Sequence, residues 1–510
     1  MIRSVRQALR AVSGINLPVL VFLLAANMLH ARTLYLAPDG DDSADCVAGA
    51  EFKTLKRSLS CLIAGDTLMI RNGSYSGGVY VYNLYGTEDS PVVIMGESLE
   101  SVIEGSENER DGLRIENSAH VVLEGFSVMR SGRAGLCVRM SHHVRVTGCR
   151  MGENEKWGIL TSFADDMIFE KNECFGSVVE HGIYHANSSD RFIIRGNRVH
   201  HNRGNGIHMN GDPDMGGDGV LSQGLVEDNI IYGNGISGGA AINMTHVQDV
   251  IVRNNLIYGN EAAGITFYDY IETATPEQQC KRAVILNNTI VFMPRKGRAC
   301  VNIQVTAQKV LMAGNILVGG GNRGVVEMHT EYLATVVADH NLYWGACDNR
   351  WVDRGSEQMD WQRWRSLSGQ DAGSLVADPL FALTDTADFT LQDTSAAVDL
   401  GLPADSVLAT LRAMEGFEWA LEQLESLPQR DIRGAPRPVG AAPDAGAYEH
   451  GDWPTSYYDF NRDGKLSMVD AIELILRGIR TPEDPALDVN GDGGYTISDV
   501  IQLLIIMRQA

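Results

Sequence analysis

Two acidic segments near the C-terminus carry the clearest chemical pattern in the chain. In DFNRDGKLSMVD, residues 459–470, Gly464 stands at the sixth position, where a calcium loop must turn sharply. Oxygen ligands recur through the segment at Asp459, Asn461, Asp463, Ser467 and Asp470, and the backbone carbonyl of Lys465 completes the set. Hard oxygen ligands at this spacing bind Ca²⁺. The segment therefore predicts a calcium loop.

A second segment, DVNGDGGYTISD at residues 488–499, repeats the pattern with Gly493 at the turn. Its ligands are Asp488, Asn490, Asp492, the carbonyl of Gly494, Thr496 and Asp499. Apolar-periodic sequence follows each loop, AIELILRGI after the first, and predicts a helix. We therefore expect a small α-helical calcium-binding domain at 459–510, after a short linker at 451–458.

This pair of loops resembles a type I dockerin. Both loops have Asp at position twelve, and no full helix precedes the first. The resemblance implies Ca²⁺-dependent folding and docking to a cohesin-type scaffold or surface protein. Positions ten and eleven hold Met468-Val469 and Ile497-Ser498, which depart from the Ser/Thr pairs of many dockerins. The identity of the partner is therefore open.

A second set of reactive side chains lies in the middle of the chain, around Tyr184 and His208. An imidazole can take a proton near neutral pH, and a phenol can give one to a leaving oxygen. His208 is the candidate base and Tyr184 the candidate acid. Lys281, Arg282 or Asn243 could stabilise charge on a substrate carboxylate, and Asp212 and His246 could orient His208 or the substrate.

A repeat positions these side chains. Short apolar strands end in a polar residue, as in FIIRGN and VIVRNN, and the closing asparagines recur at intervals of 25 to 33 residues. They are Asn172, Asn197, Asn229, Asn255, Asn288, Asn315 and Asn341. A second strand begins about ten residues after each asparagine, as at Gly182-Ile183 and Gly206-Ile207. Two strands per unit and glycine turns predict an all-β parallel solenoid, with the asparagines stacked in a hydrogen-bonded ladder.

The flanking segments resemble the ends of secreted right-handed parallel β-helix proteins. At the N-terminal side the segment from LYLAPDG to PVVIMGE includes an amphipathic helix, roughly 52–63, which would cap the first coil. At the other end, WQRWRSLSGQDAGSLVADPLF to RDIRGAPRPVGAAPDAGAYEH is similar to the closing segment of that family. The resemblance implies a right-handed parallel β-helix over 32–450 and a carbohydrate-active enzyme, such as a uronate polysaccharide lyase or C5-epimerase.

Alternate residues of a strand face in and out, so Ile183, His185 and Ile207 point inward and their neighbours outward. The outward residues Tyr184, His208, Asn210, Asn243, Thr245 and Tyr268 then form one polar, aromatic surface. Insertions at GDPDMGGDGVLSQ and at 269–282 should flank it, about 10 Å apart across two coils. Asn210, Asp212, Asn243, Thr245, His246 and Tyr268 are the candidate substrate-binding residues of this predicted groove.

Two other functions remain open at this stage. A glycoside hydrolase needs two carboxylates about 5–9.5 Å apart, and Asp212, Asp214 and Asp218 supply candidates, although the same loop could hold calcium or be only solvated. The second of these functions is that of a non-catalytic solenoid, which binds glycan or has a structural role at the surface. The stretch His200, His201, Arg195, Arg198 and Arg203 could attract an acidic glycan or be an ordinary solvated face.

The N-terminus and the charge balance bound the location and the partners. Three arginines precede an apolar run at 17–26, which predicts a signal peptide at 1–31 and a secreted, extracellular or cell-surface protein with no membrane span after cleavage. The net charge of -23 argues against nucleic acid as a partner. An acidic polysaccharide would need a local basic site. Among the eight cysteines, Cys46 with Cys61 and Cys280 with Cys300 are candidate disulfides, and Cys137, Cys149 and Cys174 are expected to be buried thiols.

Overall fold

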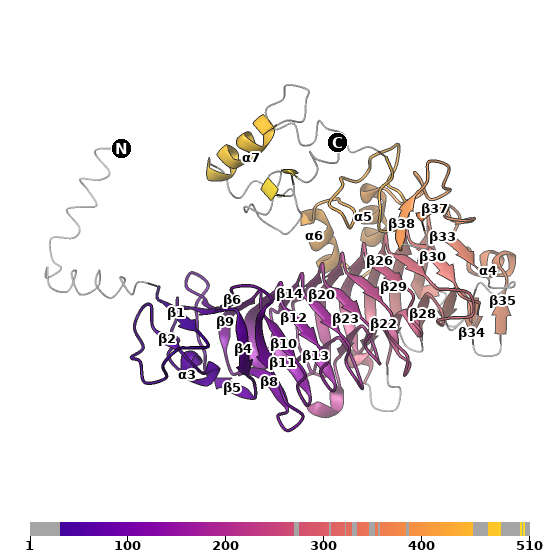
Figure 1. Ribbon diagram of the computed structural model, residues 1–510. Coiled ribbons are helices and arrows are strands. Elements are labelled where there is room, and N and C mark those ends of the chain that lie inside the picture. The colour runs from indigo at the N-terminus through magenta and orange to yellow at the C-terminus, as the bar shows by residue number, and fades with distance from the viewer. Residues whose placement is uncertain are drawn as a thin grey trace, which may run out of the picture.

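The protein is a long parallel β-solenoid with three faces (Figure 1). The computed structural model describes residues 31–269, 275–304, 308–321, 323–328, 334–345, 352–354, 357–383, 387–451 and 468–480, and residues 500, 501, 503 and 504. Residues 1–30 of the predicted signal peptide and the predicted linker beyond residue 451 lie outside this range. The prediction of an all-β parallel solenoid is confirmed.

Each coil contributes one strand to each of three faces, in the order face 2, face 3, face 1. Face 1 consists of β5 (Val79–Tyr82), β8 (Asp111–Glu116), the first part of β11 (Ala134–Thr147), β13 (Trp157–Asp165), β16 (Ile183–Ala186), β19 (Ile207–Asn210), β22 (Ala240–Thr245), β25 (Ala263–Tyr268), β28 (Val301–Ile303), β31 (Val326–Met328) and β34 (Val352–Arg354). Face 2 consists of β1 (Thr33–Leu36), β3 (Thr67–Ile70), β6 (Val92–Gly96), β9 (Ala119–Glu124), the second part of β11, β14 (Ile168–Glu170), β17 (Phe192–Arg195), β20 (Leu221–Glu227), β23 (Val247–Arg253), β26 (Lys281–Leu286), β29 (Gln308–Ala313) and β32 (Val336–Asp339). Face 3 consists of β4 (Gly73–Ser76), β7 (Ser101–Glu104), β10 (Ser127–Met129), β12 (Arg150–Gly152), β15 (Glu173–Phe175), β18 (Arg198–His200), β21 (Ile230–Tyr232), β24 (Leu256–Tyr258), β27 (Thr289–Val291), β30 (Ile316–Gly319), β33 (Leu342–Gly345) and β36 (Leu375–Val376).

A ladder of buried asparagines joins the coils at the turn between face 2 and face 3. It runs through Asn172, Asn197, Asn229, Asn255, Asn288, Asn315 and Asn341, none more than 1% exposed. Each side-chain amide donates to the Oδ1 atom of the next asparagine at 2.9 to 3.0 Å. The same Oδ1 atom accepts the backbone N–H of the preceding asparagine. The predicted ladder is confirmed, and it satisfies polar groups that would otherwise be buried without partners.

A second asparagine ladder, which the sequence analysis missed, lies at the turn between face 3 and face 1. Asn202 donates to Asn234 at 2.9 Å, and Asn234 donates to Asn260 at 3.1 Å. Asn154 begins the same column by accepting the backbone N–H of Ser131. Two of the three turns in these coils are therefore held by side-chain amides.

The N-terminal end is closed by a helix that is shorter than predicted. α3 (Leu55–Leu59) packs against β1, β2 (Glu51–Phe52) and β5 and buries Leu55 and Leu59. Thr54 caps it by accepting the N–H of Arg57. The helix ends at residue 59, before the predicted residue 63, because Cys61 is tied to Cys46 by a disulfide and Gly65 turns the chain at a φ of 84°. The predicted Cys46–Cys61 pair is confirmed.

The predicted pairing of Cys280 with Cys300 is wrong. Cys280 is a fully buried thiol whose sulfur lies 3.2 Å from the backbone carbonyl oxygen of Tyr268. Cys137, Cys149 and Cys174 are buried thiols, as expected. These sulfurs pack in the solenoid as small apolar groups.

The chain beyond the last coils folds back over faces 2 and 3. After α4 (Trp361–Ser368) and β35 (Glu357–Met359), which pairs with β34, the antiparallel hairpin of β37 (Phe381–Leu383) and β38 (Asp388–Leu391) packs against face 3. α5 (Ala404–Ala413) and α6 (Glu418–Ser426) pack on face 2, where Leu411 and Leu424 join the cluster of Ile251. The candidate site lies on face 1.

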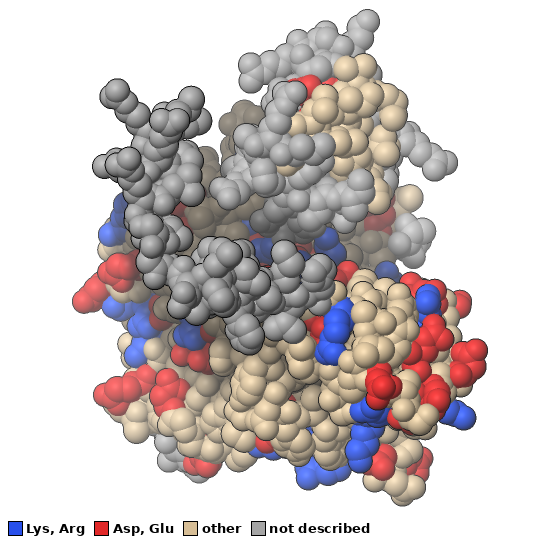
Figure 2. Space-filling view, turned by 90° about the vertical axis from the view of Figure 1, so that its left-hand side faces the viewer, with Lys and Arg blue, Asp and Glu red and all other residues tan. Residues whose placement is uncertain are grey.

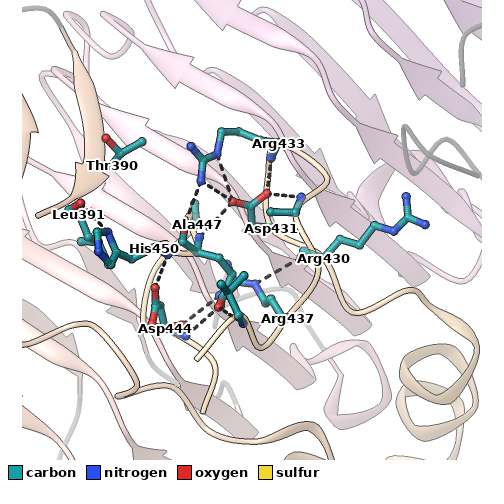
Figure 3. A network of polar contacts seen from close by, with 12 residues as sticks. Thr390, Leu391, Arg430, Asp431, Arg433, Arg437, Asp444, Ala447 and His450 are labelled. Atoms are coloured by element: carbon teal, nitrogen blue, oxygen red, sulfur yellow. Dashed lines mark hydrogen bonds and ion pairs between the residues drawn. The ribbon is translucent and has the colours of Figure 1, made fainter. Parts of the chain in front are cut away.

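A buried polar network fixes the closing segment 430–450 (Figure 3). The Arg437 guanidinium donates to Glu449 at 2.6 Å, and both side chains are at most 2% exposed. Asp431 accepts the backbone N–H groups of Arg433 and Ala435. The segment is joined to the solenoid by Ala447, whose N–H donates to Thr289 at 2.8 Å. This network anchors residues far apart in sequence to the middle coils.

Charged side chains on the outside are largely paired in opposite signs across coils. Arg130 contacts both Glu104 and Glu153, and Arg191 contacts Asp165 and Asp166. Figure 2, which looks onto the N-terminal end, shows acidic and basic side chains interspersed over the described surface. On this end of the molecule the described acidic and basic side chains are therefore mixed.

The first prediction concerns the ladder. Asn255 donates to Asn288 and to two backbone carbonyls, and it accepts from Asn229. Asn255→Ala leaves several of these buried groups without partners, so we expect a loss of about 3 kcal/mol or more in the free energy of unfolding. Denaturant unfolding monitored by circular dichroism measures it. Asn83→Gly at an exposed turn should change stability by less than about 0.5 kcal/mol, and an equal loss in both variants would contradict the role of the ladder.

Candidate active-site face

The outward side chains of face 1 form two rows across neighbouring coils. In one row Tyr184, His208, Asn243 and Thr266 are in register on β16, β19, β22 and β25. In the other row Ala186, Asn210, Thr245 and Tyr268 are in register on the same strands. This register is the predicted one. His185 points inward, fully buried, and contacts the Thr161 hydroxyl at 2.6 Å.

Tyr184 and His208 stack on each other at the centre of this face. Their ring centroids are 5.0 Å apart and their planes differ by 23°. Trp157 lies on the other side of Tyr184 at 5.4 Å, and its indole N–H donates to Glu180 at 3.0 Å. The Asn210 amide donates to the Tyr184 hydroxyl oxygen at 3.1 Å. Because the phenol oxygen accepts in this contact, its own proton can still be donated.

A hydrogen-bond chain that starts from the backbone sets the tautomer of His208. The backbone N–H of Asn205 donates to Nδ1 of His181 at 3.0 Å, so this nitrogen carries a lone pair. In a neutral His181 the proton is then on Nε2, which lies 3.1 Å from Nδ1 of His208. His208 accepts this proton's hydrogen bond and carries its own proton on Nε2. In this arrangement the Nε2 atom of His208 is a donor.

Burial keeps both rings of the stack uncharged. Burial first, and the neighbouring His181 second, lower the pKa of His208 well below its ordinary value. Burial also lowers the pKa of His181 to about 4. Burial raises the pKa of Tyr184, and Asp212 and Glu180 add to the effect. At neutral pH the cluster therefore holds two neutral imidazoles and a protonated phenol.

Several polar atoms of face 1 are buried without a hydrogen-bond partner among the described residues. They are Nε2 of His208, the hydroxyls of Thr245 and Thr266, and Oδ1 of Asn302. His208, Thr266 and Asn302 belong to one row, with Asn243 between the first two. An unpaired buried polar group costs about 1–3 kcal/mol, and three of the four coils that this row crosses carry one.

The two insertions meet, which corrects the expected 10 Å opening between them. The Gln278 amide, from η2 (Pro276–Gln278), donates to the backbone carbonyl of Asp218 at 2.9 Å. Asn243 is 4% exposed, and Thr245 and His246 are 0% exposed. The spacing of coils predicted where the insertions leave the solenoid but not that their side chains would bridge the gap. In this structure the described parts of the two insertions meet beside His246, which is fully buried, as is Thr245.

The remaining predicted substrate ligands lie around this bridge. His246 lies 3.1 Å from the Gln278 carbonyl oxygen and 3.3 Å from Asp269. Tyr268 accepts from the Asn243 amide at 3.3 Å. Asp212 stands before the short helix η1 (Pro213–Met215), and burial and the charge of Asp214 raise its pKa. Asp212 is half-buried and close enough to Tyr184 to affect its titration.

Lys281 and Arg282 do not lie in the Tyr184–His208 rows. They begin β26 on face 2, and Lys281 pairs in register with Gln248, three residues beyond Thr245. Arg282 forms an ion pair with Asp249 at 2.6 Å. The sequence placed both beside the site because the insertion ends there, but the chain has already turned the corner to the next face. Their role toward a substrate carboxylate stays a prediction.

The predicted basic stretch is already paired. Arg195 contacts Glu227 at 2.6 Å, His200 contacts Glu173 at 3.2 Å, and Arg198 donates to the Tyr232 hydroxyl. The stretch therefore has the character of an ordinary surface, with much of its charge compensated.

The sequence analysis assigned no role to His181. It precedes Gly182, the residue that opens β16's segment, and Asn205 precedes Gly206 in the same way on the next coil. This shared position places His181 beside the row of outward residues that contains His208. It is the sequence feature from which a contact between the two histidines could have been predicted. The tautomer that follows depends on one backbone N–H, which no sequence pattern reports.

Of the predicted calcium ligands, Asp470 is described by the structure. Its side chain is fully buried at the start of α7 (Met468–Arg480), the helix predicted to follow the first loop. Asp470 is the twelfth residue of the predicted loop, a position at which a calcium loop carries a carboxylate ligand. The other predicted ligands lie outside the described residues: Asp459, Asn461, Asp463, Lys465, Ser467, Asp488, Asn490, Asp492, Gly494, Thr496 and Asp499.

A family model places the solenoid among known proteins. The model for the right handed beta helix region matches residues 70–214 and 175–339, which together span more than half of the chain. The chain belongs to the right-handed β-helix family. This β-helix protein thus has the handedness that its terminal segments suggested. A search of curated proteins found no significant match.

Solved structures that this chain matches include two lyases and an epimerase. Pectate lyase Pel9A superposes with a TM-score of 0.53 at 14% identity, covering 84% of this chain and 98% of that one. The A-module of the mannuronan C-5 epimerase AlgE6 of Azotobacter vinelandii has a TM-score of 0.40 at 15% identity, covering 62% and 91%. A rhamnogalacturonan lyase has a TM-score of 0.40 at 12% identity, covering 72% and 96%. At these identities the likeness to Pel9A shows the shared fold.

None of the described helices is long and apolar enough to cross a membrane.

The second prediction concerns the neutral histidine pair. Because the pKa of His181 is about 4 in the folded protein and about 6.5 in an unfolded chain, the unfolded state binds more protons between these values. The free energy of unfolding should therefore fall as the pH falls from about 6.5 to 4, with His181 contributing up to about 1.4 kcal/mol per pH unit. Denaturant unfolding at a series of pH values measures this slope.

His181→Gln is the matched variant, because an amide can still accept from Asn205 and donate to His208. Its stability should depend less steeply on pH in the same window. An unchanged slope would show that His181 titrates normally in the folded protein.

Proposed function

We propose that this β-helix protein acts on a uronic-acid-containing polysaccharide at face 1, by a lyase or C5-epimerase type of reaction. The observation that carries the proposal is the set of buried, unpartnered polar atoms of His208, Thr266 and Asn302 in one row of face 1, beside the Tyr184–His208 stack. Successive coils repeat every ~4.8 Å. An extended polysaccharide chain lying across them could therefore form hydrogen bonds to the unpartnered atoms of one coil after another. The shared fold with pectate lyase Pel9A supports this class of substrate.

The cluster can supply the proton transfers that such a reaction needs. Both reactions begin by removing the proton next to a uronate carboxyl, and charge builds up on that carboxyl. The Nε2–H of His208 is suited to donate to the developing charge, and the Tyr184 hydroxyl is suited to protonate a leaving oxygen. Asp212, whose pKa is raised, is then the candidate proton acceptor. A base role for His208 requires that its hydrogen bond to His181 first be broken.

A substrate has to open the surface over this row, because His208, Asn243 and Thr266 are 4 to 8% exposed. The Gln278–Asp218 hydrogen bond is the contact that joins the two insertions there. Satisfying the unpartnered atoms beneath would offset part of the cost of opening.

A glycoside hydrolase is the second candidate, favoured by the carboxyl groups of Asp212 and Asp214. Their mutual repulsion contributes to the raised pKa of Asp212, as in a pair that shares acid and base roles. New reducing ends without unsaturated uronate would identify this reaction, and a glycan that binds without turnover would identify a binding module.

The third prediction separates the roles of His208. With a panel of acidic polysaccharides as substrates, the ultraviolet absorbance of unsaturated uronate reports a lyase, and exchange of the C5 proton reports an epimerase. We expect His208→Ala to lower kcat/KM by about 10² to 10³, the usual effect of removing a donor to developing charge. His208→Gln keeps a donor and should retain activity within about tenfold of wild type.

Equal loss in His208→Ala and His208→Gln would favour the base role, because an amide cannot accept the proton. His201→Gln on an exposed turn is the control. Full activity in His208→Ala would remove His208 from the site.

We also propose that residues 459–510 form a dockerin-like calcium-binding domain that attaches the secreted solenoid to a cohesin-type partner. The support is the ligand spacing of the two loops and the buried Asp470 at the start of the amphipathic α7. The exposed apolar side chains of α7, Met468, Val469, Ile472 and Leu476, offer the kind of surface on which a partner protein docks.

The fourth prediction tests the calcium loops in the full chain. Adding Ca²⁺ to chelator-treated protein should protect residues 459–510 from limited proteolysis, because metal binding and folding are coupled in such domains. Asp463→Ala removes one charged ligand and should weaken Ca²⁺ binding by about tenfold or more. Asp405→Ala in α5 is the control. Proteolysis of residues 459–510 at the same rate with and without Ca²⁺ would contradict the proposal.

A further inference from the structure

Three histidines meet at one corner of the solenoid, outside the site on face 1. His120 is the second residue of β9, and His142 and His143 lie in β11 on the next coil, so that His120 is opposite His143. Their ring nitrogens include a set, one from each residue, that lies within 4.8 Å of one another. This is the cluster of potential metal ligands found among the described residues.

The backbone aims these side chains outward. His120 and His143 have φ values of 53° and 55°, in the left-handed region that non-glycine residues seldom occupy. The same corner position on the following coils is taken by Asp166 and Arg191, also left-handed. Side chains in this column lie above one another at the spacing of the coils. Two neighbouring pairs of this column are joined by charge, Arg191 with Asp166 at 2.7 Å and Arg282 with Asp249 at 2.6 Å.

The rings are already arranged as ligands around a small volume. Nδ1 of His142 and Nδ1 of His143 are 2.9 Å apart, and the His120 and His143 ring centroids are 4.6 Å apart. Nitrogens that share a metal at ~2.0–2.1 Å are ~3.4 Å apart in a tetrahedron, so the required adjustment is small. His142 and His143 are exposed, so their rings can adjust without disturbing the core.

We propose that His120, His142 and His143 bind a divalent transition-metal ion, with Zn²⁺ as the representative. Three imidazoles without thiolates are ligands for Zn²⁺, Cu²⁺ or Ni²⁺, whereas Ca²⁺ and Mg²⁺ take oxygen. The site differs in chemistry and place from the C-terminal calcium loops. It does not depend on the reaction proposed for face 1.

Asp166 places a carboxylate beside the three rings. Its Oδ2 atom lies 3.6 Å from Nδ1 of His143, and Arg191 holds the carboxylate in place through Oδ1 and Oδ2. Because this contact is to the nitrogen of His143 that also faces His142, the carboxylate lies where its charge can offset that of a bound cation. Three protein ligands leave a fourth position for water or for an oxygen of a bound glycan.

The experiment is metal titration of the full-length protein, prepared without a polyhistidine tag and kept in excess Ca²⁺ to fill oxygen-ligand sites. Isothermal titration calorimetry with Zn²⁺ should show one equivalent bound to wild type, and Co²⁺ should give the visible absorption bands of a nitrogen-ligated ion. His142→Ala and His143→Ala should each weaken Zn²⁺ binding by at least about tenfold.

His201→Ala is the matched control. His200 and His201 are also adjacent, with Nδ1 atoms 2.9 Å apart, but the described residues place no third histidine with them. The Zn²⁺ affinity of the His201→Ala variant should equal that of wild type. His143→Gln, which keeps a polar side chain at the left-handed position, repeats the test if His143→Ala does not fold.

Unchanged affinity in both His142 and His143 variants would overturn the proposal, and so would the absence of Zn²⁺ binding to wild type. An equal loss in His201→Ala would show that the metal is held by scattered surface histidines instead.

Discussion

The rest of the structure depends on the hydrogen bond that each buried asparagine makes to the asparagine of the next coil. Seven residues from Asn172 to Asn341 share this contact, and it fixes both the rise and the rotation between coils. Once that repeat is fixed, Tyr184, His208 and Asn243 must stand in one row, because each occupies the same position in its coil. The alignment of the candidate site thus follows from the regular stacking of the coils, which the ladder stabilises at another corner.

The ladder also explains how the chain tolerates two insertions beside the site. The intervals of 32 and 33 residues between asparagines contain extra segments that leave after β19 and β25, yet the amide contacts there keep the same length as elsewhere. The insertions are therefore free to meet outside the solenoid, where Gln278 contacts Asp218. Variation in the loops changes what covers face 1 without changing the spacing of the residues beneath.

The features that were predicted correctly from the sequence are those that depend on its periodicity. The inward His185, the outward Tyr184 and His208 and the first asparagine ladder all follow from strand alternation and a repeat. The burial of Thr245 and the tautomer of His208 depend on contacts between loops and on a single backbone N–H, which have no period. Arg282 lies on face 2 because the chain turns the corner before β26, and the repeat does not report where an insertion turns. The second asparagine ladder was not predicted from the sequence, because Ser177 interrupts its series of asparagines.

The closing segment has a consequence for the order of folding. Thr289 accepts from Ala447, and Asn254 donates to the carbonyl of Arg430, so coils in the middle of the solenoid make contacts across 158 and 176 residues of sequence. Contacts of such separation form slowly, since a long loop must close before they contribute. The coils can stack as they are made, but α5, α6 and the Arg437 network can seal face 2 only after the last part of the solenoid's chain has arrived. Until then, the apolar side chains around Ile251 remain open to aggregation.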